Sequence, residues 1–96
     1  MPYIHITRSP GVRIDDYERV VAEMGAEPVT GQLLHMAGEH DGALHTVDVW
    51  QSKAHADRFA SERLFPAFER AGVSPGAGHA HFDFDGDVVV GSAAGR

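Results

Sequence analysis

The feature that most constrains the fold is the dipeptide Asp41-Gly42, which stands between two runs of alternating apolar and polar residues. Asp-Gly is a strong signal for a two-residue hairpin turn, because glycine accepts the positive φ that such turns need. A three-residue loop would shift the pairing by one and scatter polar groups over both faces. We therefore expect a β-hairpin from about residue 31 to 51, turning at Asp41-Gly42.

This pairing predicts two chemically different faces for the hairpin, because side chains alternate along a strand. One face is wholly apolar and carries Leu34, Met36, Val47 and Val49. The other face is mixed and carries Leu33, His35, Ala37, Thr46, Asp48 and Trp50. On the mixed face Leu33 lies opposite Trp50, and His35 lies opposite Asp48 with Cβ atoms about 5 Å apart.

The segment before the hairpin has the pattern of a strand followed by a helix. Alternation predicts a strand from about residue 2 to 8, which Ser9-Pro10-Gly11 ends. Gly25 then follows a helix as a stop signal. The apolar stripe of that helix consists of Ile14, Tyr17, Val20, Val21 and Met24.

The segment after the hairpin has the pattern of a helix followed by a strand. Ser52 is the expected N-cap, Pro66 must bend or restart the helix, and Gly72 ends it. Residues 79–84 alternate again. One side of this strand carries Ala80, Phe82 and Phe84, and the other carries His79, His81 and Asp83.

The element order β-α-β-β-α-β predicts an α+β, ferredoxin-like fold, with a four-stranded antiparallel sheet and two helices on one face. Both sheet faces carry large apolar groups, yet two helices cover only one. Because a soluble monomer does not tolerate a bare apolar sheet face, we expect a homodimer with its sheets face to face, a dimeric α+β barrel. Residues 1–90 are expected to form this single domain, with 88–90 as a short strand or extension and 91–96 as a flexible tail.

Composition narrows the function classes. The chain has no cysteine, which excludes disulfides, a thiolate nucleophile and cysteine-ligated metals. Its net charge of −6 and scattered basic residues disfavour nucleic-acid and membrane-surface binding. No signal peptide or spanning segment is visible, so a cytoplasmic protein is expected. Phosphate-loop, nucleophile-elbow and dinucleotide motifs do not occur either.

From Val47 to Phe59 the chain resembles the dimeric α+β-barrel proteins, in particular the branch named after antibiotic-biosynthesis monooxygenases. That family often shows an acidic residue, an aromatic residue two positions on, and then a polar helix start. Asp48, Trp50 and Ser52 match these positions. Together with the element order, the likeness covers about residues 2 to 84.

The resemblance implies a pocket between sheet and helices that binds a hydrophobic, often polycyclic, small molecule. Activities on this fold include cofactor-free oxygenation, cyclisation, isomerisation and decarboxylation. The chain also departs from the family. Phe59 stands where many monooxygenase-type members carry a histidine, and the catalytic asparagine of quinone-forming members has no clear counterpart. Haem-degrading members need an axial histidine on a helix. The only histidine on a predicted helix of this chain is His55, and it is not assigned to that role.

The candidate catalytic pair is His35 with Asp48. A carboxylate beside an imidazole fixes its tautomer and raises its basicity, as a general base requires. The alternative is a cross-strand polar pair that contributes about 0.2–1 kcal/mol to stability. The candidates for substrate binding are Trp50, Tyr17, Phe59, Phe65, His81 and His5, each with ordinary packing or solvent exposure as the alternative. His79 and His81 share a strand face with Asp83, but no further ligand is identifiable, so no metal site is predicted.

The leading hypothesis is a cofactor-independent monooxygenase of secondary metabolism that acts on an aromatic or polyketide-type substrate. His35, oriented by Asp48, would remove a phenolic or enolic proton, and the carbanion-like product would meet dioxygen. A polyketide cyclase or isomerase would use the same base without oxygen. A non-catalytic ligand-binding dimer is the third possibility. The mixed face is assigned to the pocket, because a polar pair fits poorly in a dry sheet-to-sheet interface.

Overall fold

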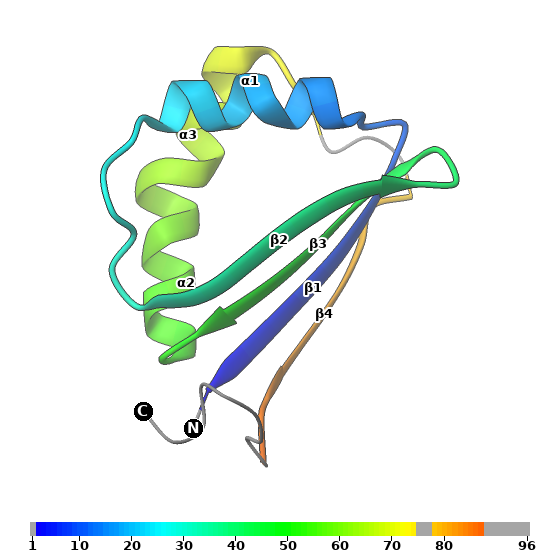
Figure 1. Cartoon of the computed structure of the whole chain (residues 1–96). Helices are drawn as coiled ribbons and strands as arrows, with labels where there is room; N and C mark the ends of the chain where they lie inside the picture. Colours follow the sequence, from blue (N-terminus) through cyan, green and yellow to red (C-terminus); the bar gives the residue numbers. More distant parts are fainter. Residues whose placement is uncertain (1, 75–77, 88–96) are drawn as a thin grey trace.

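The structure, a computed structural model, describes residues 2–74 and 78–87 (Figure 1). One antiparallel sheet has the strand order β2-β3-β1-β4, with β1 (Tyr3–Pro10), β2 (Gln32–His40), β3 (Ala43–Trp50) and β4 (Ala80–Asp85). The helical elements lie on one side of it and are α1 (Ile14–Met24), α2 (Lys53–Phe59), η1 (Ala60–Leu64) and α3 (Phe65–Ala71). The predicted ferredoxin-like α+β fold is confirmed. Within the described residues, no helix has the length and apolar character to cross a membrane. The extension predicted for 88–90 and the tail predicted for 91–96 lie outside the described residues.

The predicted hairpin register is confirmed over most of its length. His40 pairs with Ala43, and His35 pairs with Asp48. The turn residue Asp41 has φ 50° and the next residue, Gly42, has φ 73°. Positive φ at both central residues is what a two-residue turn needs to match the twist of its strands.

The register changes at the far end of the hairpin, where β2 has a bulge between Gln32 and Leu34. Gln32, and not Leu33, pairs with Trp50, so the predicted Leu33–Trp50 pair is wrong. A bulge adds one residue to a strand and thereby interrupts the alternation of its side chains. As a result Leu33 is 54% exposed, and the amide of Gln32 takes its place on the mixed face.

β1 extends to Pro10, two residues beyond its predicted end. Pro10 pairs with Ala43 of β3, whereas the pairing of β1 with β4 ends at Arg8. Proline lacks an N–H, and it is tolerated in a sheet where no neighbouring strand needs that donor. Ser9 therefore belongs to the strand, where it is buried on the helix side of the sheet.

The second helical run continues without a break from residue 53 to 71. The hydroxyl of Ser52 accepts a hydrogen bond from the backbone N–H of His55 at 3.3 Å, which confirms the predicted N-cap. Pro66 lies in the first turn of α3, directly after the π-helical η1. Because proline cannot donate to the preceding turn, a change of helical hydrogen bonding is expected at this place.

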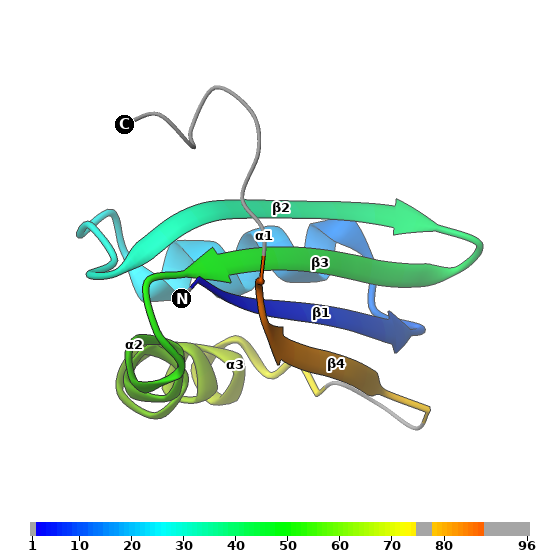
Figure 2. The same cartoon turned by 90° about the horizontal axis from the view of Figure 1, so that it is seen from below.

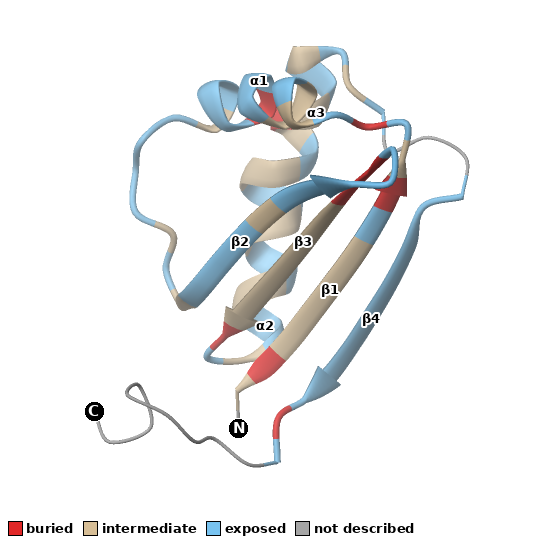
Figure 3. Ribbon diagram, turned by 45° about the vertical axis from the view of Figure 1, so that its right-hand side comes forward, coloured by how far each residue is buried: buried red, intermediate tan, exposed pale blue. Residues whose placement is uncertain are grey.

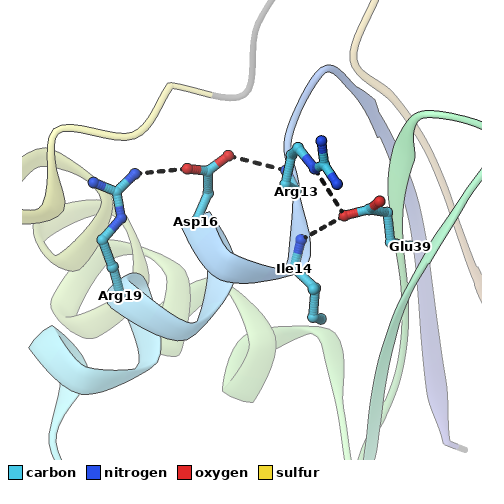
Figure 4. A network of polar contacts seen from close by, with 5 residues as sticks. All are labelled: Arg13, Ile14, Asp16, Arg19 and Glu39. Carbon is cyan, nitrogen blue, oxygen red and sulfur yellow. Dashed lines mark hydrogen bonds and ion pairs between the residues drawn. The ribbon is translucent and has the colours of Figure 1, made fainter.

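The start of α1 is tied to β2 by Glu39 (Figure 4). The Glu39 carboxylate accepts hydrogen bonds from the backbone N–H of Ile14 at 2.9 Å and from Nε of Arg13 at 3.3 Å. Asp16 accepts from the backbone N–H of Arg13 at 3.0 Å and pairs with Arg19 at 2.6 Å. Carboxylates satisfy the free N–H groups of a helix start and suit its dipole. These bonds hold the first turn of α1 beside the end of β2.

The core is concentrated near the ends of the strands rather than in the middle of the sheet (Figure 3). The buried hydrophobic residues are Tyr3, Val12, Val20, Ala43, Leu44, Trp50 and Ala67. Between them, the middles of β1 and β3 are only partly buried. The helices therefore do not pack directly on the centre of the sheet.

The other face of the sheet is apolar and open. Figure 2 shows the sheet with α1 behind it. Large side chains on the outer strands are 48–70% exposed; these are Leu33, Leu34, Met36, Phe82 and Phe84. An exposed apolar surface of this kind marks an interaction site in soluble proteins.

We expect Gly31→Ala to destabilise the fold strongly. Gly31 has φ +83°, and a Cβ there would overlap the ring and the Cβ of His55. The backbone strain alone costs about 1–3 kcal/mol, and the clash adds to it. Gly25→Ala is the matched control, since Gly25 has φ +82° with nothing within 4 Å of its Cβ position. Urea unfolding followed by circular dichroism should give the larger loss for Gly31→Ala; equal losses would contradict the clash.

Candidate functional site

A cavity of about 840 Å³, open to solvent on part of its surface, lies between the helices and the mixed face of the sheet. This volume lies within the range of pockets that bind drug-sized molecules. Strand residues of the mixed face form its floor, and α1, α2, η1 and α3 form its walls. Much of the wall is apolar and includes Val21, Met24, Phe59, Leu64 and Phe68.

Three side chains form a hydrogen-bonded chain on the β2 side of the floor. Nδ1 of His35 is bonded to Oδ1 of Asp48, and Nε2 of His35 is bonded to the hydroxyl of Tyr17 from α1. An ionised carboxylate only accepts hydrogen bonds, so the neutral imidazole donates from Nδ1 and accepts from Tyr17 at Nε2. Nε2 of Gln32 donates to the same Asp48 oxygen at 3.4 Å. Burial raises the pKa of Tyr17 to about 12, so its hydroxyl remains a donor at neutral pH.

Trp50 and Phe59 pack against each other at one end of the cavity. Their ring centroids are 5.3 Å apart, and both residues line the cavity. Trp50 is only 2% exposed, and its Nε1 has no hydrogen-bond partner within the described part of the chain. Trp50 is therefore a core residue that also borders the cavity. Phe65 lines the cavity too, but it is 63% exposed.

A second polar group lies on the β1–β4 side of the floor. The Tyr3 hydroxyl donates to Asp83 at 2.6 Å, and this bond lowers the pKa of the Asp83 carboxyl. The rings of His5 and His81 meet edge to face at 5.7 Å. Burial lowers the pKa of His5. Among residues 2–74 and 78–87, no three histidine or carboxylate side chains are placed to hold a metal ion.

The structure places every residue of the predicted site in the wall or floor of this cavity. They are His35, Asp48, Trp50, Tyr17, Phe59, His81, His5 and Phe65. Sequence reasoning missed Gln32, because the bulge has no signal in the alternating pattern. It also left out Tyr3 and Asp83, although alternation along their strands places them on the same face as His5 and His81.

Arg63 has a role that the sequence did not suggest. It donates to the backbone carbonyls of Met24 and Pro28, at 3.2 Å each, and its guanidinium carbon lies 5.9 Å from the centre of the Phe59 ring. It therefore joins η1 to the end of α1 and to the loop that follows α1.

No protein-family model matches the sequence, and no curated protein matches it. Solved structures do match. One is a putative antibiotic biosynthesis monooxygenase from Chloroflexus aurantiacus, with 18% identity, 95% of this chain and 100% of that chain covered, and a TM-score of 0.62. The chain has the fold of the antibiotic biosynthesis monooxygenase-like proteins.

Two further solved structures have the same fold. SnoaB, a cofactor-independent oxygenase from Streptomyces nogalater, is 15% identical, with 93% of this chain and 96% of that chain covered and a TM-score of 0.64. Rv0793 from Mycobacterium tuberculosis is 16% identical, with 95% and 100% covered and a TM-score of 0.66. The resemblance inferred from the sequence is thus confirmed at the level of the fold.

Proposed function

We propose that the protein is a cofactor-independent monooxygenase that acts on an aromatic, polyketide-type small molecule. The observation that carries this proposal is the Asp48–His35–Tyr17 chain on the floor of a largely apolar cavity. Such a cavity binds a hydrophobic ring system, and the chain supplies a base. SnoaB shares the fold and is described as a cofactor-independent oxygenase, which supports this reaction class.

The first step is removal of a proton from the bound molecule. Asp48 accepts from Nδ1 of His35 and therefore stabilises the imidazolium that forms. The hydroxyl of Tyr17, bonded to Nε2, passes its own proton to His35 as it receives the proton of the substrate. General base catalysis of this kind contributes about 10²–10⁴-fold to a rate.

The second step joins the carbanion to dioxygen. One electron passes from the delocalised carbanion to dioxygen, and the two radicals combine to a peroxide. Protonation gives a hydroperoxide, which loses water. A methylene group and one dioxygen molecule thus become a carbonyl group and one water molecule. Trp50 and Phe59, packed together at the end of the cavity, would hold the ring during these steps.

Anthrone is a suitable probe, because its methylene protons are acidic and its oxidation product, anthraquinone, absorbs differently. We expect uptake of one dioxygen per anthraquinone formed in an oxygen electrode. Exchange of the methylene protons in heavy water without oxygen uptake would instead indicate a cyclase or isomerase. Binding of anthrone with neither reaction would indicate a ligand-binding protein and contradict the proposal.

The proposal includes a homodimer formed through the open sheet face. We expect Leu34→Glu to weaken it, because Leu34 is 48% exposed on that face and an uncompensated buried charge costs about 3–5 kcal/mol. The dissociation constant should rise more than about a hundredfold. Ala22→Glu adds the same charge at an exposed position of α1 and is the control. Sedimentation velocity over a range of concentrations measures the dimer dissociation constant of each variant. A monomeric wild type would contradict the dimer.

A further inference from the structure

One row of the sheet carries acid–base groups across its whole width. Strand pairing puts His35 opposite Asp48, Asp48 opposite His5, and His5 opposite Asp83. Each strand contributes one member, and all four side chains line the cavity. Neighbouring strands lie about 4.8 Å apart. Imidazole and carboxylate therefore alternate along the floor, from β2 through β3 and β1 to β4.

Asp48 stands between two imidazoles in this row. On one side its Oδ1 is bonded to Nδ1 of His35. On the other side is His5, whose pKa is lowered by burial while the charge of Asp48 acts in the opposite direction. The charge of Asp48 thus favours a proton on His5, although His35 also engages the same carboxylate.

The far side of His5 is also organised. Asp83 is held by the Tyr3 hydroxyl at 2.6 Å, which keeps the carboxyl ionised and oriented. The charge of Asp83 favours a proton on His5, and those of His81 and His79 disfavour it. Burial outweighs these charges and lowers the pKa of His5, so the ring is neutral at neutral pH. Asp48 and Asp83 are the two nearby carboxylates that can stabilise a transient imidazolium.

His35 is poorly placed to serve a second group that forms at the reacting carbon. Both of its ring nitrogens are engaged, one by Asp48 and the other by Tyr17. His5 lies two strand intervals away, about 10 Å along the floor. A reacting carbon bound between the two rings would have His35 on one side and His5 on the other, with the peroxide directed toward His5.

We propose that His5 is a second catalytic residue, which returns a proton to the reacting molecule after His35 has removed one. This role rests on the proposed function, in which the peroxide anion must be protonated. His35 takes up the first proton of the methylene carbon through the Tyr17 hydroxyl. That proton passes across Asp48 to His5, which gives it to the terminal peroxide oxygen. His35 then takes the remaining proton of that carbon as the O–O bond breaks, and this proton joins the leaving hydroxide as water.

The first test needs no substrate. Imidazole nitrogens of the full-length protein are followed by NMR over a pH titration. We expect Asp48→Asn to lower the titration midpoint of His5 and His35→Gln to raise it. His45→Gln is the control, because His45 bonds to the His40 carbonyl and does not line the cavity. A His5 midpoint that is the same in all variants would overturn the shared carboxylate.

The second test uses anthrone to separate the removal of the methylene proton from the return of a proton to the peroxide. In His5→Gln we expect anaerobic exchange of the methylene protons in heavy water to stay within about twofold of wild type, while aerobic anthraquinone formation falls about a hundredfold. His5→Asn repeats the measurement if the glutamine variant does not fold. If the His5 variants lose both reactions, or lose neither, the role of His5 is refuted and the proposed function still stands. Absence of exchange in wild type refutes the proposed function, and the role of His5 with it.

Discussion

Replacing His35 by glutamine is expected to lower the oxidation of anthrone by about two orders of magnitude while the fold is retained. Glutamine fills a similar volume but cannot take up the proton. Asp48→Asn should have an effect of the same order, because an amide does not stabilise the imidazolium as a carboxylate does. Oxygen uptake at saturating anthrone is the measurement, with circular dichroism to show that each variant is folded.

His45→Gln is the control for this pair, since it removes an imidazole from the same hairpin outside the cavity. It should oxidise anthrone at the wild-type rate. If His35→Gln and Asp48→Asn keep the wild-type rate, the pair is only a cross-strand polar contact and the proposed base is wrong. A variant that binds anthrone normally but does not oxidise it supports the assignment most directly.

Trp50→Ala is expected to cost about 3–5 kcal/mol of unfolding free energy, the usual loss for a large buried aromatic residue. Trp50 is 2% exposed and packs on Phe59 with ring centroids 5.3 Å apart. The alanine variant loses this packing and leaves a void beside the cavity. Trp50 is the only tryptophan, so unfolding in urea must be followed by circular dichroism rather than by tryptophan fluorescence.

Trp50→Phe is the matched control. It keeps an aromatic ring against Phe59 and removes an indole N–H that has no hydrogen-bond partner among the described residues. Because an unpaired buried donor is costly, its removal offsets part of the lost volume. We therefore expect only a small loss of stability. If Trp50→Ala unfolds like wild type but binds anthrone weakly, Trp50 acts mainly as a stacking platform and not as core.

Much of the fold could be predicted because its signals are local. The two-residue turn at Asp41-Gly42 determines the pairs next to it, and alternation assigns each following residue to a face. The opposition of His35 and Asp48 followed from this pattern and is confirmed. The end of β1 was misjudged at Pro10, because whether proline ends a strand depends on a neighbour that the local sequence does not show.

The contacts of the candidate site also fall into those that the local sequence predicts and those that it does not. Alternation alone puts His35, Asp48 and Trp50 on one hairpin face, so the sequence by itself determined that these three side chains share a face of the sheet. The bulge that brings Gln32 to Asp48 has no local signal, and the bond from Tyr17 to His35 depends on how α1 is set against β2 by Glu39. Only the tertiary structure decided these contacts, because they depend on the position of one element relative to another. The cavity has the same origin, since it is the space left where the helices stand off the sheet.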